Sequence, residues 1–127
     1  MIVFIILALA IARIIPHPPN FTPILGMAVF SGTFIGKKTF AYLIPLVAMF
    51  LSDLYLGFHS GMPIIYFSLA LCVLIGTFIG ARSTILIYVL GISAGVIVFY
   101  LITNFAVWYG SGMYDYTFSG LITCYVM

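Results

Sequence analysis

The sequence has very little charge. Four basic and two acidic residues occur among 127, so 5% of the chain is charged, against about 25% in a typical soluble domain. A soluble fold of this composition would present a surface almost free of charge and would aggregate. The net charge of +2 also leaves no basic patch for the phosphates of nucleic acid. These shortages exclude a soluble globular protein and predict that no nucleic acid is bound.

Cysteine and the common catalytic motifs are scarce too. The two cysteines, Cys72 and Cys124, lie far apart in apolar runs without a C-x-x-C pair, so neither a redox motif nor a zinc site is indicated. There is no H-E-x-x-H, no G-x-S-x-G and no phosphate loop,. The spacing of His17, Asp53 and His59 matches no metal-binding pattern. We therefore expect no enzyme, no metal and no cofactor, and an enzyme acting on lipids is the least supported alternative.

Long apolar runs are what the chain has in abundance. It is 65% hydrophobic with a mean hydropathy of +1.36, and its apolar runs do not alternate with polar residues as a membrane barrel requires. The charged residues divide these runs into spans near the length that a bilayer needs. We predict an all-α, polytopic transmembrane helical bundle that forms a single domain over residues 1–127. Its six expected helices are residues 1–15, 21–36, 39–56, 63–81, 83–108 and 117 onward.

Both ends of the sequence affect this prediction. The first run, "MIVFIILALAIA", has small-residue sites like those of a signal peptide but no positive residue before it, which favours an uncleaved first helix. The last run, residues 117–127, would reach only about 16 Å as a helix. We expect a truncated sixth helix whose remainder is missing from this sequence.

The basic residues predict an orientation. Lys37, Lys38 and Arg82 are separated by two spans and therefore belong on one face, which the positive-inside rule identifies as cytoplasmic. The N-terminus is then cytoplasmic as well. Arg13 alone falls on the outer face, and a residue that departs from a strong rule is a candidate for function.

The remaining polar side chains with functional chemistry gather in the outer half of the predicted bundle. An ionisable group inside a membrane costs about 3 kcal/mol or more, so it usually faces a cavity or a partner. The prolines of "PHPP" would hold the first outer loop rigid. We predict one externally open pocket that binds a small molecule. Its candidate residues are Arg13, His17, Asn20, Asp53, His59, Asn104 and Trp108.

Each of these residues also has a purely structural interpretation. Asp53 can form an ion pair with Arg13 that only holds helices together. Asn104 can join two helices by hydrogen bonds, and the histidines can be ordinary loop residues. Trp108, with the tyrosines around it, can belong to an aromatic belt at the membrane surface. The argument for function therefore rests on the joint placement of these residues.

Small residues recur at helical spacing. Residues four apart form a flat strip on one helix face and let another helix approach closely. We expect the glycine pairs to pack within the chain, whereas Ala8 and Ala12 could contact a helix of another subunit. The glycine pairs are Gly32/Gly36, Gly76/Gly80 and Gly91/Gly95.

Three segments resemble a known group of proteins. "ARIIPHPPNFTPILGMAVFSG", "PLVAMFLSDLYLGFH" and "TNFAVWYGSGMYDYTFSGLITCY" look like an uncharacterised family of small bacterial membrane proteins classed as putative transporters. More distantly, the layout is similar to the S-components of energy-coupling factor transporters. That resemblance implies the bacterial cytoplasmic membrane, a vitamin pocket lined by Asn20, Asp53, His59 and Asn104, and a coupling subunit docked at Ala8 and Ala12. The cysteine that cobalamin-binding members are thought to use has no clear match here.

Two functions follow as expectations. The first is uptake of a small, vitamin-like molecule through the outer pocket, in which Trp108 and Tyr109 offer stacking faces. The alternative is a structural accessory subunit of a larger membrane complex, in which the small-residue strips face neighbouring chains. Membrane lipid is a partner in both cases.

Overall fold

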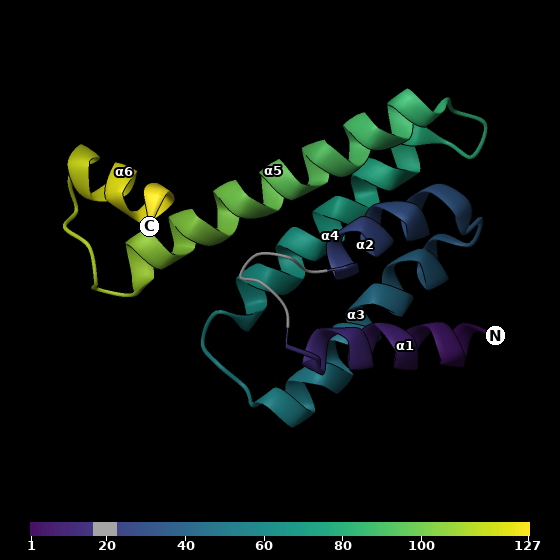
Figure 1. Cartoon of the computed structure of the whole chain (residues 1–127), viewed down its shortest axis with the longest axis horizontal. Helices are drawn as coiled ribbons and strands as arrows, with labels where there is room; N and C mark the ends of the chain where they lie inside the picture. Colours follow the sequence, from purple (N-terminus) through teal and green to yellow (C-terminus); the bar gives the residue numbers. More distant parts are fainter. Residues whose placement is uncertain (17–22) are drawn as a thin grey trace.

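A computed structural model describes residues 1–16 and 23–127, and these residues form an all-helical chain without strands (Figure 1). The helices are α1 (Ile2–Ile14), α2 (Pro23–Phe34), α3 (Lys38–Leu56), α4 (Met62–Ile79), α5 (Ile85–Gly110) and α6 (Phe118–Val126). The prediction of an all-α chain with six helices is confirmed for the described part. Each boundary lies within two residues of the predicted one.

Three helices, α3, α4 and α5, are long and apolar enough to cross a membrane. They contain 19, 18 and 26 residues, which corresponds to about 28, 27 and 39 Å, against about 30 Å for the hydrocarbon core. Helices α1 and α2 are apolar but shorter, with 13 and 12 residues. These lengths and this composition indicate a membrane protein.

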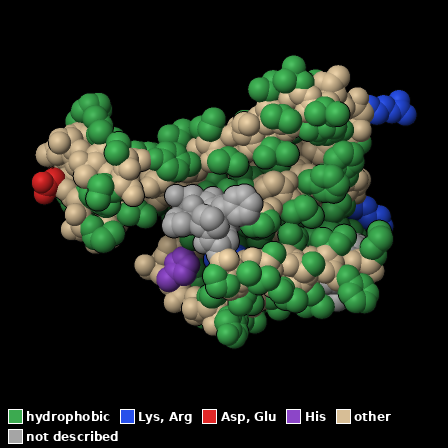
Figure 2. All heavy atoms as spheres, viewed as in Figure 1, with side chains coloured by type: hydrophobic (Ala, Val, Ile, Leu, Met, Phe, Trp, Pro, Cys, Tyr) green, Lys and Arg blue, Asp and Glu red, His purple; other side chains and the backbone are tan. Residues whose placement is uncertain are grey.

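The connections that carry exposed basic residues lie together. Lys37 precedes α3 and Arg82 lies between α4 and α5. Figure 1 shows both connections, and the N-terminus, at the right-hand end of the bundle. Lysine and arginine side chains appear at that end in Figure 2, and an acidic side chain appears at the far left. The α3–α4 and α5–α6 connections lie at the left-hand end, so the polar groups near them share the end opposite the lysines.

The centre of the bundle is the close crossing of α2 and α4. A Cβ atom on Gly32 would overlap the carbonyl oxygen of Val73, and one on Gly76 would overlap the carbonyl oxygen of Val29. The backbones therefore touch directly. The hydroxyl of Thr33 adds a hydrogen bond to the carbonyl oxygen of Gly76 at 3.0 Å, so the contact combines close packing with a polar tie, as in membrane bundles generally.

The other predicted glycine contacts divide into two groups. Gly91 and Gly95 are buried where α5 crosses α4, against Ile79 and Cys72 respectively, which confirms their packing role. The prediction was wrong for Gly36 and Gly80. Neither has an atom within 4 Å of the place where a Cβ would stand, because both lie in connections just beyond the ends of their helices.

A proline in the middle of α3 is matched by a serine of α2. Pro45 has no N–H group, so it cannot donate the usual helical hydrogen bond to the carbonyl four residues earlier, at Ala41. That carbonyl instead accepts a hydrogen bond of 2.7 Å from the hydroxyl of Ser31, and all three residues are buried. The polar group that the proline leaves open is thus satisfied within the protein, as a membrane interior requires.

Helix α5 is the longest of the described helices, yet it buries very few of its residues. It packs on α2, α4 and α6, and its only buried residues are Gly91 and Gly95. Its C-terminal half runs beyond the other helices toward the left in Figure 1, and α6 folds back beside it. This half of α5 leaves a concave surface between itself and the beginning of α4.

Candidate functional site

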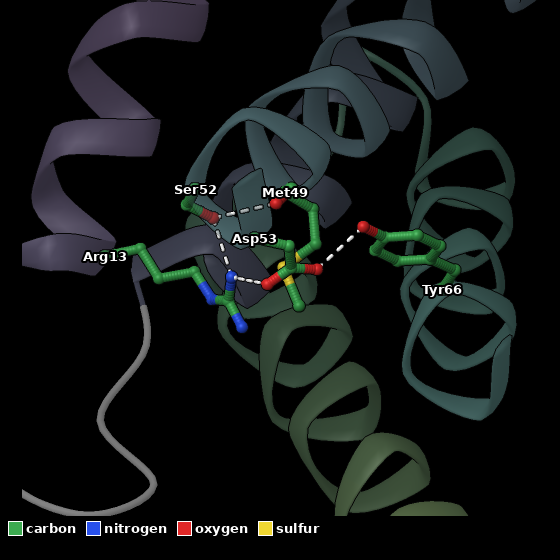
Figure 3. A network of polar contacts seen from close by, with 5 residues as sticks. All are labelled: Arg13, Met49, Ser52, Asp53 and Tyr66. Atoms are coloured by element: carbon green, nitrogen blue, oxygen red, sulfur yellow. Dashed lines mark hydrogen bonds and ion pairs between the residues drawn. The ribbon is translucent and has the colours of Figure 1, made fainter. Parts of the chain in front are cut away.

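A buried ion pair joins the ends of two helices. Arg13, in the last turn of α1, is bonded through Nη1 to Oδ1 of Asp53, in the last turn of α3 (Figure 3). The Asp53 side chain is 1% exposed and the Arg13 side chain 15%. A carboxylate in such surroundings is stable in its charged form only with a partner. The predicted contact between these two residues is therefore present.

Two hydroxyl groups complete the network. Nη1 of Arg13 also donates to Oγ of Ser52 at 2.6 Å, and Ser52 donates to the carbonyl oxygen of Met49 at 2.8 Å. The hydroxyl of Tyr66 in α4 donates to Oδ2 of Asp53 at 2.7 Å. Both carboxylate oxygens are thus bonded, and no buried side-chain nitrogen or oxygen in the described residues lacks a partner. We call Arg13, Ser52, Asp53 and Tyr66 the ion-pair network.

Sequence reasoning missed Tyr66. The chain has nine tyrosines, and nothing in composition separates this one from those expected at the membrane surface. A positional signal was nevertheless available. Asp53 lies three residues before the end of α3, and Tyr66 lies four residues after the start of α4. In two antiparallel helices joined by a short loop, such positions have the same depth.

An open groove lies on the other side of this part of α4. It has a volume of about 1060 Å³. The connection before α4 contributes His59 and Ser60, and the first turn of α4 contributes Ile64 and Ile65. The opposite wall is formed by the C-terminal part of α5 from Leu101 to Gly110, without Asn104 and Trp108, and by Ser111 just after it, with Tyr125 of α6 at one end. We call this surface the α4–α5 groove.

The groove and the ion-pair network lie on two sides of the same turn of α4. Ile64 and Ile65 line the groove, whereas the next residue, Tyr66, is bonded to Asp53. A movement of this turn would therefore change both the shape of the groove and the hydrogen bond between Tyr66 and Asp53. The groove itself is largely apolar with a few polar groups, which is the usual character of small-molecule sites.

The structure does not bring all the predicted site residues into one pocket. Arg13 and Asp53 are together, and His59 lines the groove. Asn104 is elsewhere, because α5 contacts α2, α4 and α6 but neither α1 nor α3. The side-chain amide of Asn104 donates to the carbonyl oxygen of Tyr100, on its own helix, at 2.9 Å. The expectation of a single pocket around Arg13, Asp53 and Asn104 is thus replaced by two neighbouring features.

The remaining predicted residues fall as follows. Trp108 donates from Nε1 to the carbonyl oxygen of Asp115 at 3.0 Å, and its ring lies 5.5 Å from that of Phe105. His17 and Asn20 lie outside the described residues. Ala8 is exposed on α1 and Ala12 is partly buried.

The carboxylate of Asp53 is fully engaged within the ion-pair network. Both oxygens of Asp53 are already bonded, and its neighbours are a guanidinium and two hydroxyls. Within residues 1–16 and 23–127, no three His, Cys, Asp or Glu side chains gather as metal ligands would. What the arrangement can do is hold α1, α3 and α4 together through charge and hydrogen bonds, beside an open, largely apolar groove.

One comparison with known proteins gives a match. The model of DUF6580, described as a family of unknown function, matches residues 1–127, the whole chain. No curated protein and no solved structure matches this chain.

Proposed function

This chain belongs to DUF6580, a family of unknown function, and we propose that it takes up a small molecule across the bacterial cytoplasmic membrane. The observation that carries the proposal is the presence of a largely buried ion pair and an open groove on two sides of the same helical turn. Ionisable side chains inside a membrane are costly, and they commonly mark substrate or ion pathways.

The proposed orientation places the groove outside. The N-terminus, the start of α3 with Lys37 and Lys38, and the connection that carries Arg82 share one end of the bundle, which the positive-inside rule assigns to the cytoplasm. The opposite end then faces the exterior. It holds His59 and Ser60, which line one end of the groove; we call that end the mouth. The chain is a multi-pass protein in this arrangement, with α3, α4 and α5 as full spans.

The ion-pair network would couple binding to movement. A molecule in the groove presses on Ile64 and Ile65, and the same turn carries Tyr66, whose hydroxyl is bonded to Asp53. A shift of that turn weakens the hold of Asp53 on Arg13, the residue through which α1 is tied to α3. Helix α1 packs only on α2 and α3 among the described helices, so it is the element most easily released.

The energy for uptake would come from a partner. The exposed Ala8 and the partly buried Ala12 lie four residues apart, a spacing that lets a helix of another chain approach closely. We propose that a membrane coupling subunit contacts α1 there, as the similarity to S-components implies. Movement of α1 on release of Arg13 would then be transmitted directly to that subunit.

The test is uptake by cells that express the full chain. Untargeted mass spectrometry of the medium should show at least one small solute that is depleted faster than by cells with an empty vector. Tyr66→Phe removes only the hydroxyl bonded to Asp53 and should slow that depletion. Tyr55→Phe, in the exposed part of α3, is the matched control and should not. Equal depletion with the empty vector would refute uptake, and normal uptake by Tyr66→Phe would remove the ion-pair network from the mechanism.

A second function is favoured by α5. Twenty-six residues with only two buried present a long apolar surface, which in an accessory subunit would be covered by other chains. Purification in a mild detergent separates the two proposals. Stoichiometric recovery with a large membrane assembly, and no solute depletion by cells, would support the subunit and exclude uptake.

A further inference from the structure

The lining of the α4–α5 groove restricts the charge of any molecule that it holds. None of the described residues that line it is Lys, Arg, Asp or Glu. A charge in such surroundings would lose its hydration without gaining a partner. The occupant is therefore uncharged along its length. A phospholipid is a poor fit, because the described lining residues include no Lys or Arg to meet its phosphate.

Hydrogen-bonding capacity is concentrated at one end of the groove. At the inner end, the hydroxyl of Tyr125 already donates to the carbonyl oxygen of Leu101 at 2.6 Å, and Thr103 donates to that of Phe99 at 2.7 Å. At the mouth, the side chains of His59 and Ser60 are exposed and form no hydrogen bond with other described residues. The groups available to a polar head thus lie at the mouth, and the interior is left for an apolar tail.

The groove is elongated. Its wall along α5 runs from Leu101 to Ser111, about 15 Å at the rise of an α-helix. The volume of about 1060 Å³ lies at the upper end of the range for small-molecule sites, about 300 to 1,000 Å³. Between mouth and inner end, the walls are apolar side chains such as Ile64, Ile65 and Phe105.

We propose that the α4–α5 groove binds an uncharged, elongated amphiphile, with its polar head at His59 and Ser60 and its apolar part along α5. This rests on the proposed uptake function and names the class of its substrate. The amphiphile enters from the exterior by its tail, and the head remains at the membrane surface, where hydroxyl and imidazole groups replace its lost water.

The chain contains its own reporter for this site. Trp108 is the only tryptophan, and its ring packs at 5.5 Å from that of Phe105, which lines the groove. Bromine quenches tryptophan fluorescence at contact. The probe is 2-bromoundecan-1-ol, whose bromine lies beside the head and therefore at the Trp108 end of the groove, added to the intact protein in nanodiscs of an uncharged lipid. Its carboxylate and trimethylammonium analogues test the effect of charge.

Two alanines of α5 supply matched variants. Ala106→Phe fills the groove, whereas Ala94→Phe adds the same ring at an exposed position outside the lining. Quenching by the alcohol should saturate in the wild type and in Ala94→Phe. In Ala106→Phe the apparent affinity should fall at least about tenfold, which corresponds to about 1.4 kcal/mol. Ile64→Phe fills the groove from the α4 side and provides the same test if Ala106→Phe does not fold.

Three outcomes would overturn the inference. Equal quenching in the filled and control variants would mean that the alcohol only partitions into the bilayer. Equal affinity for the charged analogues would contradict the uncharged class, and unsaturable quenching in the wild type would contradict a site. Saturable binding without solute depletion by cells would refute uptake and leave the groove assignment standing.

Discussion

At the scale of single residues, variants of Arg13 and Asp53 allow the effect of the ion pair on stability to be measured apart from its effect on function. Asp53→Leu alone leaves the Arg13 guanidinium without its partner and should lower the free energy of unfolding by about 3 to 5 kcal/mol. The double variant Arg13→Met with Asp53→Leu replaces both charges by apolar side chains of similar size. It should be about as stable as the wild type. Thermal unfolding in detergent measures both effects.

The same double variant bears on the role of the pair. If the pair serves transport, the protein with two apolar replacements folds but no longer depletes solute from the medium. If the melting temperature of the double variant is lowered as much as that of Asp53→Leu alone, the two charges cannot be replaced together by apolar side chains. Normal uptake by a stable double variant would assign the pair to structure alone.

At the scale of helices, Ser31 and Pro45 form a pair across α2 and α3. Ser31→Ala leaves the carbonyl oxygen of Ala41 buried without a donor and should destabilise the fold by about 1 to 3 kcal/mol,. Pro45→Ala restores an N–H group four residues after Ala41. Added to Ser31→Ala, it should recover part of the loss. A double-variant cycle in thermal unfolding checks this, and strictly additive effects would contradict the coupling.

The crossing of α2 and α4 yields a second prediction at this scale. Gly32→Ala would place a methyl group against the carbonyl oxygen of Val73 and should cost about 1 to 3 kcal/mol. Gly26→Ala in the same helix, with nothing within 4 Å of the new Cβ, should be neutral or stabilise by up to about 1 kcal/mol. Equal melting temperatures for the two variants would show that the backbones do not touch as described.

At the scale of the whole molecule, the orientation can be tested directly. Single cysteines can be placed at Ser60, Gly36 and Ala81 after replacement of Cys72 and Cys124 by alanine. All three positions are exposed in connections between helices, and none removes a basic residue. In intact cells an impermeant maleimide should label only the cysteine at position 60. Positions 36 and 81 should react only after permeabilisation, and the reverse pattern would invert the proposed topology.

The order and extent of the helices were predictable, because apolar runs and the sparse charges locate spans without any knowledge of packing. The contact between Arg13 and Asp53 was predictable for the same reason, since few ionisable groups were available to pair. The partner Tyr66 and the groove were not. In a chain this uniformly apolar, most helix faces look alike in the sequence. Which faces meet then depends on details such as Gly32 against Val73, which the pattern alone cannot assign.

The placement of Asn104 illustrates the same limit. Depth in a membrane follows from position along the chain, so Asn104 was correctly expected near the end that also holds Asp53. Lateral position does not follow from depth. Helices α2 and α4 contact α5, whereas α1 and α3 do not, and this arrangement keeps the Asn104 amide away from Asp53.

The pairing of Arg13 with a residue 40 positions later has a consequence for biosynthesis. A ribosome that adds about 5 to 20 residues per second needs on the order of 2 to 8 seconds to make Asp53 after Arg13. Throughout this interval the nascent first helix carries an unmatched cation, which costs about 3 kcal/mol at the centre of a bilayer. We expect this segment to remain at the headgroup layer or beside the insertion machinery until α3 emerges, so that α1 and α3 enter the lipid as a neutral pair.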